Sequence, residues 1–137
     1  MSSWPKTFAE TGFIVKAKSL PLLFAKTGRK VTQIQAKAVR STKEKEFSLK
    51  AENVNELLYL FLSKLLLIKD TDLFLANRFK ISLKTAPGRH RLKAILKGGS
   101  IPKDPNLLLV EIKAISYHRL KVEKIKQNWQ ATVVVDV

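Results

Sequence analysis

The feature that most constrains this chain is a stretch near its middle that is apolar on almost every side. Leucines, together with Val54 and Phe61, fill most positions between residues 54 and 67. Just before them, Asn53 followed three residues later by Glu56 has the form of a helix N-cap with a capping box. The pattern predicts a helix from about residue 53 to residue 69. Because a helix that is apolar all round must be covered on several sides, we expect it to lie at the centre of the fold.

The residues that precede this helix predict a strand, a helix and a second strand. Apolar and polar residues alternate over residues 12–18 and again over residues 47–52, as in half-buried strands. Between them, Ser19 and Pro21 have the form of a helix start, and the helix is expected to run to about residue 39. Gly28 within it indicates either a close packing contact or a break. Residues 41–46 are charged and are interpreted as a loop.

The residues after the apolar helix change to a period of two. They predict a hairpin over residues 79–97, a long strand over residues 110–122 and a last strand over residues 129–137. The order β-α-β-α followed by antiparallel strands predicts an α+β fold, with two helices packed on a mainly antiparallel sheet. We interpret residues 1–137 as a single domain, because a chain of this length fits one core.

Composition narrows the cellular setting. The 137 residues are 45% hydrophobic and include no cysteine, which excludes disulfides and thiolate metal sites and favours a reducing compartment. The first ten residues lack the pattern of a signal peptide. The longest apolar stretch, residues 57–68, is shorter than the roughly 20 residues that span a bilayer. We therefore expect a cytoplasmic protein without a membrane partner.

The net charge of +15 is the least ordinary property of the chain. A field of this sign attracts RNA or an acidic protein surface. However, many of the lysines alternate with apolar residues, as on the solvated face of strands, and no aromatic residues that would stack on bases are interleaved with them. The charge alone leaves direct RNA binding and simple solvation both open.

Catalytic motifs are missing from the sequence. It contains no phosphate-binding P-loop, no GxSxG and no HExxH motif, and only two histidines, His90 and His118. No nucleophile stands beside an evident base. The sequence therefore favours a protein that is not an enzyme.

Three acidic residues stand in unusual positions. Glu10 precedes the first predicted strand, Glu52 ends the second strand, and Asp136 lies among apolar residues of the last strand. A carboxylate in such surroundings needs a partner, water or a cation. Three carboxylates together would suit a hard cation such as Ca²⁺ or Mg²⁺. Nothing in the spacing of the three residues places them together.

Three segments closely resemble the archease family. Residues 55–61 (NELLYLF), 111–118 (EIKAISYH) and 133–137 (VVVDV) match the family's NELLYLF helix, its EVKAxTYH strand and its terminal VVxDV, in the same order. The similarity extends over essentially the whole chain: residues 9–13 stand where the family has HTADxGI, and residues 20–24 where its LEEAF helix begins.

The resemblance implies an accessory function. Archeases promote guanylylation and repeated turnover of the GTP-dependent tRNA-splicing RNA ligase, and they bind a metal through acidic residues. The corresponding positions here are Glu10 and Asp136, with Glu52 where many members carry another acid. The expected cofactor is a divalent cation, Ca²⁺ before Mg²⁺ or Mn²⁺. The expected partners are the ligase and, through the positive charge, tRNA itself, with contacts at Lys113, Tyr117 and His118.

The chain also departs from the family pattern. Where the family has HTAD, residues 7–10 read Thr-Phe-Ala-Glu, so the histidine is gone and the aspartate is a glutamate. Residues 107–109 are leucines where the family pocket often supplies a histidine. These departures identify a divergent member with an altered metal site. The alternative is a basic RNA-binding module on the same fold, whose metal site has degenerated.

Overall fold

The computed structural model describes Trp4 and residues 9–137. In chain order the elements are β1 (Glu10–Ala17), α1 (Leu20–Gln35), β2 (Lys43–Ala51), α2 (Val54–Asp72), β3 (Phe74–Ala86), β4 (Arg89–Ser100), a short 3-10 helix (Pro105–Leu107), β5 (Ala114–Ile115), β6 (Lys121–Ile125) and β7 (Asn128–Asp136).

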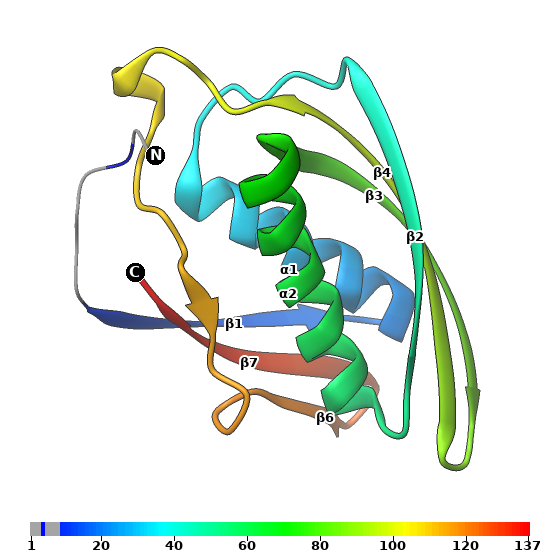
Figure 1. The fold of residues 1–137 in the computed structure, drawn as a ribbon. Coiled ribbons are helices and arrows are strands. Elements are labelled where there is room, and N and C mark those ends of the chain that lie inside the picture. Colours follow the sequence, from blue (N-terminus) through cyan, green and yellow to red (C-terminus); the bar gives the residue numbers. More distant parts are fainter. Residues whose placement is uncertain (1–3, 5–8) are drawn as a thin grey trace.

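The strands form two antiparallel sheets. One has the order β1-β7-β5, with β6 also paired to β7, and the other has the order β2-β4-β3. Both helices lie between the two sheets, with α2 in front of α1 in the view of Figure 1. The α+β class and the antiparallel pairing are confirmed, while the strands divide between two sheets instead of forming one.

Helix α2 lies in the core, as its sequence predicts. Leu57, Leu58, Phe61 and Leu62 are fully buried, and the apolar side chains of both sheets belong to the same cluster. Burying a side chain of this size contributes about 1.5–3 kcal/mol. The predicted cap is also present, since Asn53 Oδ1 accepts a hydrogen bond from the backbone N–H of Glu56 at 2.8 Å. The helix ends one turn later than predicted.

Helix α1 is continuous through Gly28, so the close-packing interpretation of this glycine is the correct one. A Cβ atom at Gly28 would lie 2.8 Å from Cε2 of Phe79 and 3.3 Å from Cε2 of Phe61. The helix ends at Gln35 and not near residue 39. Its C-cap, Ala36, is extended and pairs with Leu108.

Two other predictions of secondary structure are wrong. Residues 43–46 belong to β2 and not to a loop; within them, Lys45 lies 2.8 Å from Asp72, and its hydrogen bond lowers the pKa of that carboxyl group. The expected long strand over residues 110–122 is interrupted. It consists of a segment without strand structure that hydrogen-bonds to the end of α1, the short strand β5, a turn over residues 117–119, and β6.

Candidate functional site

The acidic residues near the two ends of the described chain lie side by side. Glu10 is the register partner of Asp136 in the antiparallel pairing of β1 with β7, and Asp136 also pairs with Ala114 of β5. We call Glu10 and Asp136 the acidic edge. They line a surface pocket of about 510 Å³ together with Ala9, Lys113 and Val137.

Backbone hydrogen bonds hold the acidic edge from both sides. The N–H of Val137 donates to the carbonyl of Ala9 at 2.8 Å, and the N–H of Ala9 donates to the carbonyl of Val137 at 3.0 Å. On the other side, the N–H of Lys113 donates to the carbonyl of Asp136 at 2.7 Å. The backbone positions of the two acids are thereby fixed relative to each other.

The carboxylate of Glu10 already has a partner. Arg119, in the turn after β5, donates from Nη1 to Glu10 Oε2 at 2.7 Å. Both side chains are more than half exposed, at 64% for Arg119 and 53% for Glu10. An exposed pair of this kind is worth no more than about 1 kcal/mol, so Glu10 remains available to a stronger ligand. The sequence gives no sign of this pairing.

The structure does not bring Glu52 to the acidic edge. This residue lies in the connection between β2 and α2, which Figure 1 shows across the molecule from the start of β1 and the end of β7. Within residues 9–137 and Trp4, no three His, Asp or Glu side chains are grouped so that they could hold a metal ion. Thr7 and Phe8, which replace the first residues of the family's HTAD, lie outside the described residues.

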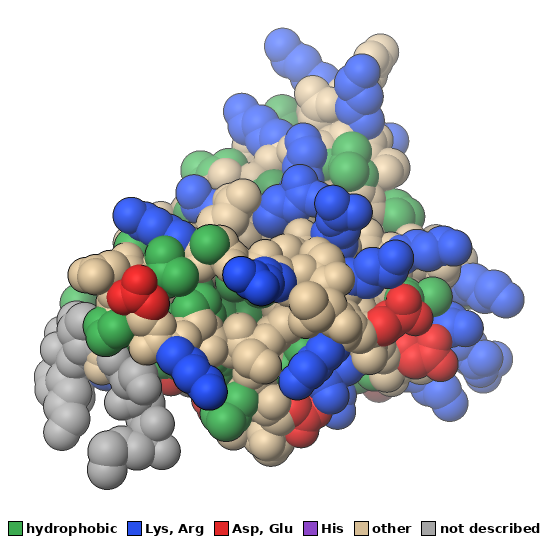
Figure 2. All heavy atoms as spheres, turned by 90° about the horizontal axis from the view of Figure 1, so that it is seen from above, with side chains coloured by type: hydrophobic (Ala, Val, Ile, Leu, Met, Phe, Trp, Pro, Cys, Tyr) green, Lys and Arg blue, Asp and Glu red, His purple; other side chains and the backbone are tan. Residues whose placement is uncertain are grey.

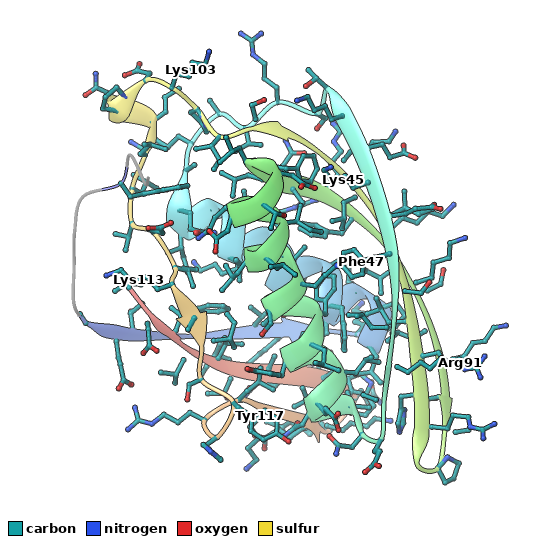
Figure 3. All side chains as sticks on the ribbon, viewed as in Figure 1. Lys45, Phe47, Arg91, Lys103, Lys113 and Tyr117 are labelled. Carbon is teal, nitrogen blue, oxygen red and sulfur yellow. The ribbon has the colours of Figure 1, made fainter. Side chains whose placement is uncertain are left out.

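The predicted partner-contact residues occupy two neighbouring places. Lys113 lines the pocket of the acidic edge, and Figure 3 shows it beside β5 and β7. Tyr117 and His118 instead line a groove of about 550 Å³ with Asn53 and Asn55. Tyr117 is 50% exposed, and its ring meets that of Tyr59 edge to face, with 4.9 Å between centroids.

A buried polar network lies behind the acidic edge. Lys69 is only 2% exposed; its Nζ donates to Gln35 Oε1 at 3.1 Å and to the carbonyl of Ile112 at 2.8 Å. The carboxylate of Glu111 lies 3.4 Å from the same nitrogen. The network ties α2 to the segment that leads into β5, and so supports the position of Lys113.

Sequence reasoning missed this network, although a signal for it exists. Lys69 follows Leu65 by four residues and Leu66 by three, so it shares their face of the helix. A lysine on the buried face of an otherwise apolar helix requires partners inside the protein.

The geometry thus defines a small α+β protein with an exposed acidic edge. Comparison with known proteins identifies the family within this class. The model of the Archease protein family (MTH1598/TM1083) matches residues 5–137. The chain belongs to the archease family.

Individual relatives agree with this assignment. The chain is 31% identical over 108 residues to the protein archease of Pyrococcus abyssi, covering 78% of this chain and 72% of that one. It is 30% identical over 105 residues to the protein archease of Methanosarcina mazei, covering 76% and 72%. The solution structure of Methanobacterium thermoautotrophicum protein 1598 has the same fold, with a TM-score of 0.81 at 21% identity, covering 96% of this chain and 95% of that one.

A crystal structure from Thermotoga maritima, described as an archease and possible chaperone, is also similar. Its TM-score is 0.62 at 18% identity, covering all of this chain and 98% of that one. The prediction of a non-enzymatic protein agrees with the assignment to the archease family. Within the described residues, neither helix combines the length and the hydropathy that a bilayer-crossing segment needs.

Proposed function

We propose that this protein is a cytoplasmic accessory factor that stimulates guanylylation and turnover of the GTP-dependent tRNA-splicing RNA ligase, and that it acts through the acidic edge. The observation that carries the proposal is the register of Glu10 with Asp136 across β1 and β7. Membership in the archease family supports the choice of partner. Exposure of both carboxylates makes them accessible to a docked protein.

The donor set of the acidic edge suits a hydrated cation better than a fully caged one. Ca²⁺ takes six to eight oxygen ligands, whereas Mg²⁺ commonly keeps several waters and is held by one or two carboxylates. Glu10 and Asp136 supply two carboxylates on adjacent strands. Lys113 lines the same pocket, and its positive charge disfavours a bound cation. We therefore place Mg²⁺ or Mn²⁺ before Ca²⁺ at these two residues, without Glu52.

The residues of the edge provide position and charge. When bound, the cation would offset the negative charge of the nucleotide phosphates in the ligase. The backbone bonds of Ala9 and Lys113 hold the two acids in place, so that little ordering is needed on docking. Tyr117, held edge to face by Tyr59, supplies an exposed aromatic anchor of the kind that is enriched at protein interfaces.

The decisive measurement is the rate at which the ligase becomes guanylylated. We expect the wild-type protein to raise this rate when ligase, GTP and Mg²⁺ or Mn²⁺ are mixed, and Asp136→Asn to return it to that of the ligase alone. Glu44→Gln is the matched control, because it also removes one exposed acid, but on the other sheet, and should stimulate normally. An unaltered rate with the wild-type protein would rule out the proposed activity.

Arg119 competes with a cation for Glu10. Arg119→Gln should therefore tighten cation binding by up to about fivefold, which corresponds to the roughly 1 kcal/mol of an exposed pair. Isothermal titration with Mn²⁺ measures this change. Lys121→Gln is the control, because it breaks another surface ion pair, with Glu123. That pair lies on β6, where Lys121 is opposite Thr132 and not Asp136. Equal affinities of the Arg119 variant and the wild-type protein would show that Arg119 does not compete with the cation at Glu10.

A further inference from the structure

The outer surface of the β2-β4-β3 sheet carries a regular array of basic side chains. Along each strand, residues that face the helices are buried or half-buried, such as Leu92, Leu96 and Phe79, while the alternate residues are exposed. Both helices lie on one side of this sheet, and Figure 3 shows Arg91 pointing away from them. We call the exposed basic residues the basic face: Lys50, Arg78, Lys80, Lys84, Arg91, Lys93 and Lys97.

The strand register arranges the basic face in rows. Lys50, Arg91 and Lys84 are direct cross-strand neighbours in one row, and Lys93 is flanked by Ser48 and Ser82 in the next. Side chains in a row are about 5 Å apart at Cβ, and successive rows about 7 Å apart. The acids Glu44 and Glu46 share this outer surface at the other end of β2, where Glu44 is the register partner of Lys97. The positive charge is therefore densest toward the β3–β4 hairpin.

Protection of edge strands does not explain this array. Lysines often protect edge strands from pairing with other chains, but Arg91, Lys93 and Lys97 lie on β4, the central strand of the sheet. Like charges that lie directly opposite each other destabilise a sheet. Within residues 9–137, no member of the basic face forms an ion pair within 4.0 Å. A bound polyanion or added salt would reduce the repulsion between the positive charges of the row.

The chemistry of the basic face favours a nucleic-acid backbone over a protein or a membrane. Protein interfaces are depleted of lysine and depend on apolar or aromatic anchors. On the outer surface of this sheet, Ile95, between Glu46 and Lys80, is the only large apolar side chain. The same scarcity disfavours a membrane surface, where apolar side chains insert between lipids. Lysine, arginine and serine side chains are the groups that contact phosphates.

We propose that the basic face binds the phosphodiester backbone of RNA. The choice of RNA over DNA rests on the proposed function, because the ligase acts on RNA. The basic face lies on a different sheet from the acidic edge, so that one molecule can hold RNA and engage the ligase at the same time. Figure 2 shows how widely Lys and Arg side chains spread over one view of the surface, compared with Asp and Glu. Binding of this kind is independent of sequence.

The test compares two triple variants of equal charge. Lys84→Gln, Arg91→Gln and Lys93→Gln neutralise the basic face, whereas Lys18→Gln, Lys37→Gln and Lys103→Gln remove three exposed lysines elsewhere. The probe is a fluorescein-labelled RNA hairpin, followed by anisotropy over a series of salt concentrations. In the first triple variant we expect Kd to rise at least about tenfold, and the slope of log Kd against log salt to fall by about 2–3. The second variant should change Kd far less.

Each other outcome has a defined meaning. Equal losses in the two variants would reduce the binding to net charge and overturn the proposal. Tighter binding to a DNA hairpin of the same sequence would overturn the choice of RNA. Vesicles of phosphatidylcholine and phosphatidylserine form the membrane arm; binding to them that depends on the basic face, with RNA binding unaffected, would assign the surface to lipid instead.

Two cross-measurements separate this proposal from the function of the acidic edge. The basic-face variant should stimulate guanylylation normally in a mixture without RNA, and Asp136→Asn should bind the RNA hairpin as the wild-type protein does. Two independent surfaces are supported if the basic-face variant loses only RNA binding and Asp136→Asn loses only the stimulation of guanylylation. If the wild-type protein fails to stimulate the ligase, the RNA measurement still stands on its own.

Discussion

Replacing Lys69 with alanine should lower the free energy of unfolding by about 3–5 kcal/mol, the cost of removing one partner from a buried ionic network. The change leaves the carbonyl of Ile112 without its 2.8 Å donor and the carboxylate of Glu111 without the ammonium group 3.4 Å away. It also removes a side chain that is almost completely buried. Urea denaturation followed by circular dichroism measures the loss.

Lys64→Ala is the control on the same helix. The Lys64 ammonium lies 6.0 Å from the centroid of Phe47, an interaction worth about 0.5–1 kcal/mol, so this variant should lose no more than about that amount. Lys69→Met separates the two contributions of Lys69, because it retains packing of the stem without the charge. Similar stabilities of the Lys69→Ala and Lys64→Ala variants would show that the network contributes little.

Gly98→Ala is expected to cost about 3 kcal/mol, at the upper end of the range for overpacking. Gly98 lies in β4, between Lys43 of β2 and Ala76 of β3. A Cβ atom there would collide with the carbonyl oxygen of Leu75 and would lie 2.8 Å from the Cα of Ala76. These are backbone atoms of the neighbouring strand, so relief requires the sheet itself to move.

Gly12→Ala provides the matched comparison in the other sheet. A Cβ atom at Gly12 meets only Val133 O at 3.4 Å and a Val134 methyl at 3.6 Å, which are ordinary contacts. This variant should be neutral, or up to about 1 kcal/mol more stable because the unfolded chain loses freedom. Thermal unfolding of the two variants side by side measures the difference in their stability. Equal losses of stability in both variants would argue against the backbone clash at Gly98.

Much of the fold could be predicted because local patterns agree with the tertiary packing. The cap at Asn53 and the apolar run that follows it specify α2, and alternation through Phe79 and Leu83 specifies β3. The segment before β5 misled the prediction because its partner is not a strand. The N–H of Leu109 and the N–H of Val110 donate to the carbonyls of Gln35 and Ile34 at the end of α1. Such a contact produces no regular alternation of apolar and polar residues that the sequence would reveal.

The candidate site was predictable only with help from the family pattern. The spacing of Glu10 and Asp136 in the sequence says nothing about the distance between them in the fold. They lie close together because two strands that are far apart in sequence pair with each other. The same resemblance suggested Glu52, which the structure leaves at the start of α2. The pairing of Arg119 with Glu10 depends on how a turn is oriented, and no sequence rule gives that.

The pairing of β1 with β7 also sets an order of events during synthesis. Strands β2, β3 and β4 find their partners nearby in sequence, whereas β1 waits for β7 until almost the whole described chain has been made. Domains generally fold as units, so the pairing of β1 with β7 forms only when nearly all of the described chain is available. A fragment truncated before β7 would therefore lack the paired carboxylates, because one strand of the pair would be absent.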